Sequence, residues 1–118
     1  MMSSDPALQK SPFQLAEEHF QNALQVGRRS PDLSDRVAMI DGFRKALEVD
    51  PEGHAEVRGH LAWGYYCNSQ FEAAAQEYLQ ILKRNPQDAD ANYYGALSLI
   101  RSFRGKEAWP LLFRAARK

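Results

Sequence analysis

Apolar residues recur along this 118-residue chain at helical spacing, and capping residues or prolines separate the segments that they define. The first segment carries apolar residues three or four positions apart, which places them on one helix face: Phe13, Ala16, Phe20 and Leu24. Ser11 and Gln14 have the spacing of a capping box, and Pro12 suits a first helical position. This pattern predicts a helix that begins at Ser11 and ends near Gly27.

Five further helices follow from the same kind of pattern. The second is predicted from Ser30-Pro31 to Asp50-Pro51, because the residue before a proline disfavours the helical region. The other four are expected at about 53–68, 71–84, 89–103 and 105 to the end. Sustained two-residue alternation, which would indicate strands, is absent from the sequence. Short connections predict antiparallel neighbours, and Pro110 predicts a bend near Glu107 without a break.

A shift of 34 residues places the third and fourth predicted helices on the fifth and sixth. Small residues then coincide, Ala62 with Ala96 and Ala74 with Ala108. Large residues coincide as well: Trp63 with Leu97, Tyr65 with Leu99, Tyr66 with Ile100, and Tyr78 with Leu112. One hairpin cannot bury its own apolar face, so this periodicity predicts hairpins that stack and share a core.

The middle repeat resembles the tetratricopeptide repeat family. The residues at the family's spacing are Leu61, Ala62, Tyr65, Ala74, Tyr78 and Pro86. The last repeat matches through Gly95, Ala96, Leu99, Ala108, Leu112 and Ala115, with leucines in place of aromatics. The first matches only through Phe43, Ala46 and Pro51, and its interhelical segment, around Gly27 to Asp35, is about ten residues too long. The resemblance implies an all-α solenoid of three stacked helix–turn–helix repeats with about six antiparallel helices.

Domain organisation and localisation follow from length and composition. Residues 1–10 are expected to form a disordered tail, and 11–118 a single domain with repeats at about 11–51, 53–86 and 88–118. The N-terminus lacks the apolar run of a signal peptide, and no stretch approaches the ~20 apolar residues of a membrane span. We therefore expect a cytoplasmic protein without membrane contact. Cys67 is the only cysteine, so an internal disulfide is impossible.

Charge gives little support for a nucleic-acid partner, because the net charge is zero. Cations gather near the C-terminus and face a single acidic residue, Glu107: Arg101, Arg104, Lys106, Arg114, Arg117 and Lys118. Cations at helix C-termini suit the helix macrodipole. The alternative is a basic end that attracts an acidic partner.

The sequence contains no phosphate-binding loop and no nucleophile motif, which predicts a protein that is not an enzyme and needs no cofactor. His54, His60 and Cys67 are the obvious candidates for metal ligation. Their spacings of six and seven residues do not bring them together on one helix, since shared ligation needs three or four. We expect no metal site.

Aromatic residues in the first helices of the second and third repeats are the sharpest functional signal. In the tetratricopeptide family these helices line a concave face, which the resemblance assigns to Gly59, Trp63, Tyr66 and Cys67, and to Tyr93, Leu97, Ile100 and Arg101. Tyr65 and Leu99 are expected in the core. The candidate partner-binding residues are His60, Trp63, Tyr66, Tyr93, Tyr94, Leu97 and Arg101.

Exposed aromatics in a groove are typical binding anchors. We therefore expect a protein–protein interaction module that binds a peptide or helix of a partner. The apolar character of these positions argues against a basic clamp for a peptide carboxylate. The alternative is that the first repeat or the tail covers them.

The last predicted helix has more apolar residues than one packed face can use. Trp109, Leu111 and Phe113 are therefore candidate contacts for a homo-oligomer. A second copy, a downstream segment or a different partner could each cover them. Self-assembly through this end is the alternative function that the sequence predicts.

Overall fold

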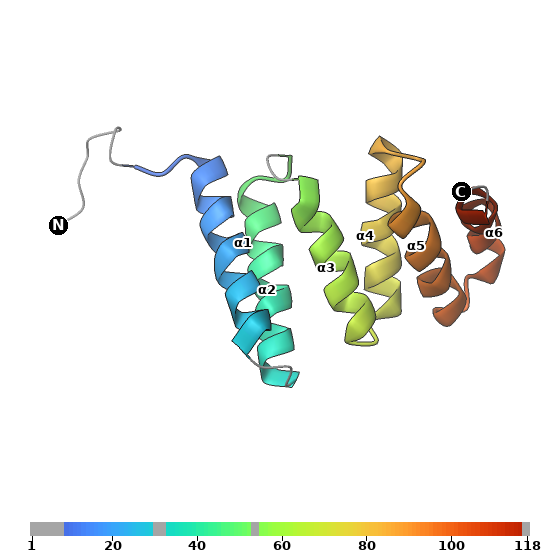
Figure 1. The fold of residues 1–118 in the computed structure, drawn as a ribbon, viewed down its shortest axis with the longest axis horizontal. Coiled ribbons are helices and arrows are strands. Elements are labelled where there is room, and N and C mark those ends of the chain that lie inside the picture. Colours follow the sequence, from blue (N-terminus) through green and yellow to red (C-terminus); the bar gives the residue numbers. More distant parts are fainter. Residues whose placement is uncertain (1–8, 30–32, 53–54, 117–118) are drawn as a thin grey trace. The chain divides into compact units, whose positions relative to one another are not determined.

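The computed structural model describes residues 9–29, 33–52 and 55–116. Within these ranges the chain forms six α-helices and no strand (Figure 1), so the predicted all-helical class is confirmed there. The helices are α1 (Pro12–Arg29), α2 (Leu33–Val49), α3 (Ala55–Cys67), α4 (Phe71–Arg84), α5 (Ala89–Arg101) and α6 (Gly105–Ala116). None of the described helices combines the length and the apolar character that a membrane crossing needs. Most of the tail predicted over residues 1–10 lies outside the described residues.

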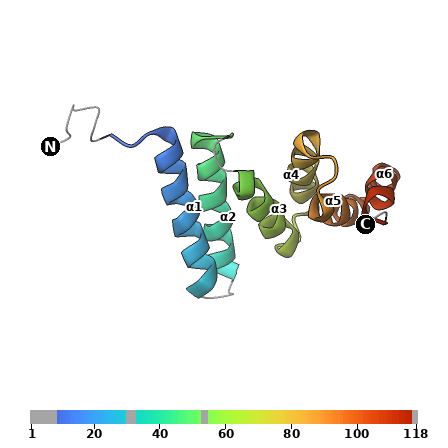
Figure 2. The same cartoon turned by 45° about the horizontal axis from the view of Figure 1, so that its top comes forward.

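The chain divides into an N-terminal part, residues 1–57, and a C-terminal part, residues 58–118. In the N-terminal part α1 and α2 lie side by side as an antiparallel hairpin (Figures 1 and 2). Its core contains the rings of Phe20 and Phe43, whose centroids lie 5.8 Å apart. A Cβ on Gly42 would lie 2.7 Å from the Cβ of Ala23, so this glycine allows the two helices to approach closely.

The predicted capping box at the start of α1 is confirmed. The backbone N–H of Gln14 donates to Ser11 Oγ at 3.1 Å, and the Ser11 N–H donates to Gln14 Oε1 at 2.9 Å. These two hydrogen bonds satisfy donors that the first helical turn leaves without a partner. Pro12 is the first helical residue, as predicted.

The predicted long segment between the first two helices is wrong. The helix α1 continues through Gly27 to Arg29, and α2 already begins at Leu33. A glycine inside a helix costs only about 1 kcal/mol relative to alanine, which packing can offset. Here a Cβ on Gly27 would lie 2.5 Å from the sulfur of Met39, so the glycine makes room for that side chain. The extra residues of this region lengthen both helices.

In the C-terminal part, α4 contacts α5 and α5 contacts α6. The core of these helices and of α3 is built largely from small residues: Ala62, Ala74, Ala75, Ala91, Ala96 and Ala108. Tyr78, Leu99 and Leu111 supply the larger buried side chains. Gly95 lies at the centre of this packing, since a Cβ there would be 3.1 Å from both Tyr78 Cβ and Leu111 Cδ2. Small residues thus set the close spacing of α4, α5 and α6.

The turns that follow α3 and α5 have the same backbone geometry. Ser69 and Phe103, 34 residues apart, have φ angles of 61° and 63°. The N–H after each of them donates back across the helix end, from Gln70 to the Tyr65 carbonyl at 2.8 Å and from Arg104 to the Leu99 carbonyl at 2.7 Å. This is the hydrogen bond of a helix that ends in a left-handed residue. The turns repeat at the same 34-residue interval as the alanines.

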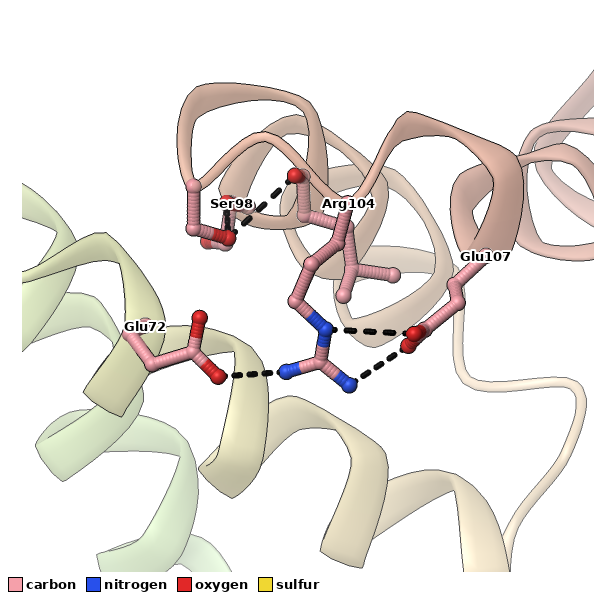
Figure 3. A network of polar contacts seen from close by, with 6 residues as sticks. Glu72, Ser98, Arg104 and Glu107 are labelled. Carbon is pink, nitrogen blue, oxygen red and sulfur yellow. Dashed lines mark hydrogen bonds and ion pairs between the residues drawn. The ribbon is translucent and has the colours of Figure 1, made fainter.

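Arg104 joins three helix-terminal segments of the C-terminal part (Figure 3). Its guanidinium contacts Glu72 in the first turn of α4 at 2.5 Å and Glu107 in the first turn of α6 at 2.5 Å. These carboxylates, Glu107 foremost, raise the pKa of Arg104. The helix α6 continues through Pro110, so the predicted absence of a break is confirmed.

Candidate binding surface

Six aromatic side chains of α3, α4 and α5 form one connected group, here called the aromatic cluster: Trp63, Tyr66, Phe71, Tyr78, Tyr93 and Tyr94. Tyr94 is its centre, with ring centroids at 4.9 Å from Trp63, 5.0 Å from Tyr93 and 5.7 Å from Tyr66. Trp63 and Tyr66 stack almost in parallel, at 5.5 Å and 11°. Such offset and edge-to-face contacts favour each ring's position beyond the burial of its area.

The aromatic cluster has an inner and an outer part. Tyr78 is buried, and Tyr66 and Tyr94 are half-buried. Trp63 and Tyr93 retain 45% and 49% of their surface in contact with solvent. The outer rings are therefore supported from behind by other rings while they stay open to a ligand.

Tyr78 belongs to the packing of the cluster. Burial raises the pKa of its phenol, and the Asp90 carboxylate raises it further. The hydroxyl therefore stays neutral across the physiological range, and Tyr78 acts as a buried support for Tyr94, 6.4 Å away.

Arg101, in the last turn of α5, lies against the same cluster. Its Cζ atom is 5.8 Å from the Tyr66 ring centroid and 5.2 Å from that of Phe71. Both distances are within the range of cation–π attraction. The aromatic cluster therefore carries one cation at its edge.

Phe71 is a member of the cluster that sequence reasoning missed. A 34-residue shift places it on Gly105, so the repeat pattern marks no aromatic at this position. The available signal was the short turn 68–70, which brings the first residue of α4 beside the last turn of α3. Phe71 meets Tyr66 there edge to face at 5.5 Å.

The structure brings four predicted partner-binding residues into ring contact, and Arg101 joins them. His60 is exposed on α3, and Leu97 is half-buried on α5. Leu99 is buried, as predicted, whereas Tyr65 is only partly buried against the core. Cys67 and Ile100 are exposed, and Gly59 is half-buried.

The predicted contacts on α6 divide between two faces of the helix. Trp109 and Phe113, four residues apart, are 62% and 66% exposed, and their ring centroids lie 6.3 Å apart. The prediction of an exposed Leu111 is wrong, because this side chain is only 4% exposed. Leu111 lies three residues after the buried Ala108 and so shares its inward face, where it packs toward Gly95.

Two cations of the basic C-terminal group have structural partners. Arg114 Nε donates to the side-chain oxygen of Asn92 at 2.9 Å, and Arg104 pairs with its two glutamates. Asn92 is fully buried, and its amide nitrogen also donates to the carbonyls of Pro86 and Asp88. Sequence reasoning missed this buried polar residue. Arg117 and Lys118 lie outside the described residues.

Within the described ranges, no three histidine, cysteine, aspartate or glutamate side chains gather as a possible metal site, and His54 lies outside these ranges. No known protein-family model matches the chain, and no curated protein matches it.

Proposed function

We propose that this chain is a protein-binding module built from tetratricopeptide-like repeats. Residues that coincide under the 34-residue shift have the same environment: Ala62, Ala74, Ala96 and Ala108 are all buried. The left-handed residues Ser69 and Phe103 have the same spacing. This agreement between the sequence period and the local geometry supports a stacked helical repeat.

The observation that carries the function is the pair of exposed rings, Trp63 and Tyr93, on a layer of supporting aromatics. A ring already held by its neighbours loses little conformational freedom on binding, so more of the contact energy remains as affinity. Tryptophan and tyrosine are also the residues most enriched among binding hot spots. We assign to this surface a peptide or helix of a partner protein, with Trp63 as the central anchor.

The test compares two exposed tryptophans of the same part of the chain. The immobilised native protein captures a partner from cell extract, and its affinity is then measured with Trp63→Ala and Trp109→Ala. We expect Trp63→Ala to weaken binding at least about tenfold, equal to ~1.4 kcal/mol, because a hot spot costs this much or more. Trp109→Ala is the matched control and should bind like the native protein. Equal binding by both variants, with unchanged circular dichroism, would exclude this surface.

A second candidate function is self-assembly through α6. Under the 34-residue shift Trp109 coincides with Ala75 and Phe113 with Leu79. Ala75 is fully buried and Leu79 packs against the core, while Trp109 and Phe113 are exposed. The face that α4 covers is thus open on α6, and a second copy would bury it.

Sedimentation velocity over a concentration series tests self-assembly. We expect the native protein to associate as concentration rises and Trp109→Ser/Phe113→Ser to remain monomeric. A native protein that is monomeric at the highest concentration would dispose of this function. The same variant should still bind the partner captured through Trp63, which separates the two surfaces.

A further inference from the structure

Arg101 differs from the other arginines that interact in the C-terminal part. Three of them contact an acidic or amide side chain: Arg58 with Glu77, Arg104 with Glu72 and Glu107, and Arg114 with Asn92. Arg101 is exposed and contacts two aromatic rings instead. No ion pair involves it within the part of the chain that the structure describes. Its charge therefore has no acidic partner there.

The position of Arg101 leaves its hydrogen-bonding edge available. A guanidinium that lies over aromatic rings uses its face, while its N–H groups point outward in its own plane. Two parallel N–H groups match the two oxygens of a carboxylate. The rings of Tyr66 and Phe71 also hold the side chain in place, so less rotational freedom is lost when an anion binds.

The charge distribution along α5 favours an anion at this end of the surface. The acidic residues of the helix, Asp88 at its cap and Asp90 in its first turn, lie at the opposite end. Eleven residues separate Asp90 from Arg101, which is roughly 16 Å along a helix axis. The macrodipole accounts for a cation in the last turn, but it does not require that cation to lie on two rings.

We infer that the partner segment of the proposed function carries an acidic side chain beside its apolar anchor: the anchor packs on Trp63 and Tyr93, and the carboxylate pairs with Arg101. Tyr66 connects the two places, because its ring contacts both Trp63 and the guanidinium of Arg101. The inference rests on the proposed function and specifies its partner. A wholly apolar segment would leave Arg101 without an anion, and a basic one would be repelled.

A phage-displayed library of random dodecapeptides tests this inference, selected in parallel on the native protein, Trp63→Ala, Arg101→Glu and Arg44→Glu. Arg44 is exposed on α2 and serves as the matched charge control. We expect the native protein and Arg44→Glu to enrich an aspartate or glutamate at a fixed distance from an aromatic or aliphatic residue. Arg101→Glu should enrich lysine or arginine at that distance. Exchanging the acidic residue of a selected peptide for its amide should weaken binding to native protein about fivefold to tenfold, and not to Arg101→Glu.

The outcomes separate this inference from the function on which it rests. Peptides that need Trp63 but show no acidic preference, or that bind Arg101→Glu unchanged, would overturn the inference and leave the binding surface standing. A selection with no peptide that depends on Trp63 would overturn both. Salt gives a further readout, because the contribution of an exposed ion pair falls as ionic strength rises.

Discussion

The two parts of the chain build their cores from different side chains. The N-terminal hairpin has helices of 18 and 17 residues, and it buries two phenylalanines that meet ring to ring. The C-terminal part has helices of 12 to 14 residues and buries mainly alanines. Helices separated by alanines lie too close for large rings to fit between them. The aromatics of the C-terminal part are therefore displaced to the edges of the contacts.

This difference explains why the candidate surface lies where it does. The N-terminal part buries Phe20 and Phe43, which hold its hairpin together. In the C-terminal part Trp63 and Tyr93 are half exposed and are held by other rings. A core of small residues thus frees large residues for binding, at the cost of less buried apolar area per helix.

The largest expected effect tests whether each part depends on its own core. Phe43→Ala should destabilise the protein by about 3–5 kcal/mol, because it removes a buried ring and leaves a cavity. Hydrogen exchange should become faster in α1 and α2 and remain slow in α4 to α6. Leu99→Ala, the counterpart in the C-terminal part, should cost about 2–5 kcal/mol and show the reverse pattern. Equal acceleration in both parts would mean that they unfold as one.

The second test adds volume where the C-terminal part has only alanine. Ala62→Leu should cost about 1–3 kcal/mol, since Ala62 has no exposed surface and its neighbours are helix backbones and other alanines. Ala96→Leu, at the same place in the next repeat, should cost a similar amount. Ala89→Leu is the matched control, because Ala89 is exposed. Urea unfolding measures all three, and an unchanged midpoint for Ala62→Leu would contradict the alignment of the repeats.

Periodicity in the sequence predicted the helices, and most of their limits were correct. It failed around Gly27, since a glycine and a basic pair look like a helix end until Met39 of the neighbouring helix is known to fill the space. It also failed at Leu111, because density of apolar residues does not say which of them face inward. Tertiary packing decides both cases.

The candidate site was predictable in its members but not in its contacts. Trp63, Tyr66, Tyr93 and Tyr94 stand out in the sequence because large aromatics recur at one register. Phe71 does not, because it enters the cluster only through a turn that folds α4 against α3. The pairing of Arg114 with buried Asn92 was hidden for the same reason, as the two residues lie 22 positions apart.

A change of pH should affect the two parts differently. All five tyrosines belong to the C-terminal part, and burial raises the pKa of Tyr78. The native state therefore keeps a proton that the unfolded state loses above about pH 10, so stability is full below that pH and falls as pH rises. The contribution of Tyr78 is about 1.4 kcal/mol per pH unit above the unfolded pKa.

Urea unfolding of the native protein and of Tyr78→Phe at pH 9, 10 and 11 measures this contribution. The difference in unfolding free energy between the two proteins should shift in favour of Tyr78→Phe as pH rises. Lysines and arginines titrate alike in both proteins, so their effects cancel in the comparison. A difference that does not depend on pH would show that Tyr78 can ionise in the folded state.

The smallest expected effect concerns the turns of the C-terminal part. Ser69 has a φ of 61°, a left-handed conformation that costs a non-glycine residue about 1–2 kcal/mol. Ser69→Gly removes this cost but adds freedom to the unfolded chain, which returns about 0.5–1 kcal/mol of it. We expect a net stabilisation of about 0.5–1 kcal/mol, measured by thermal unfolding.

Ser69→Ala is the control for this prediction, because alanine keeps the Cβ that makes the left-handed region unfavourable. It should give no stabilisation, and a gain equal to that of glycine would mean that the turn is not strained. Phe103, with a φ of 63°, provides the second half of the test. Phe103→Gly should stabilise by a similar amount, since its ring is 97% exposed and little packing is lost. Similar gains 34 residues apart would show that the two turns are repeats in energy as well as in geometry.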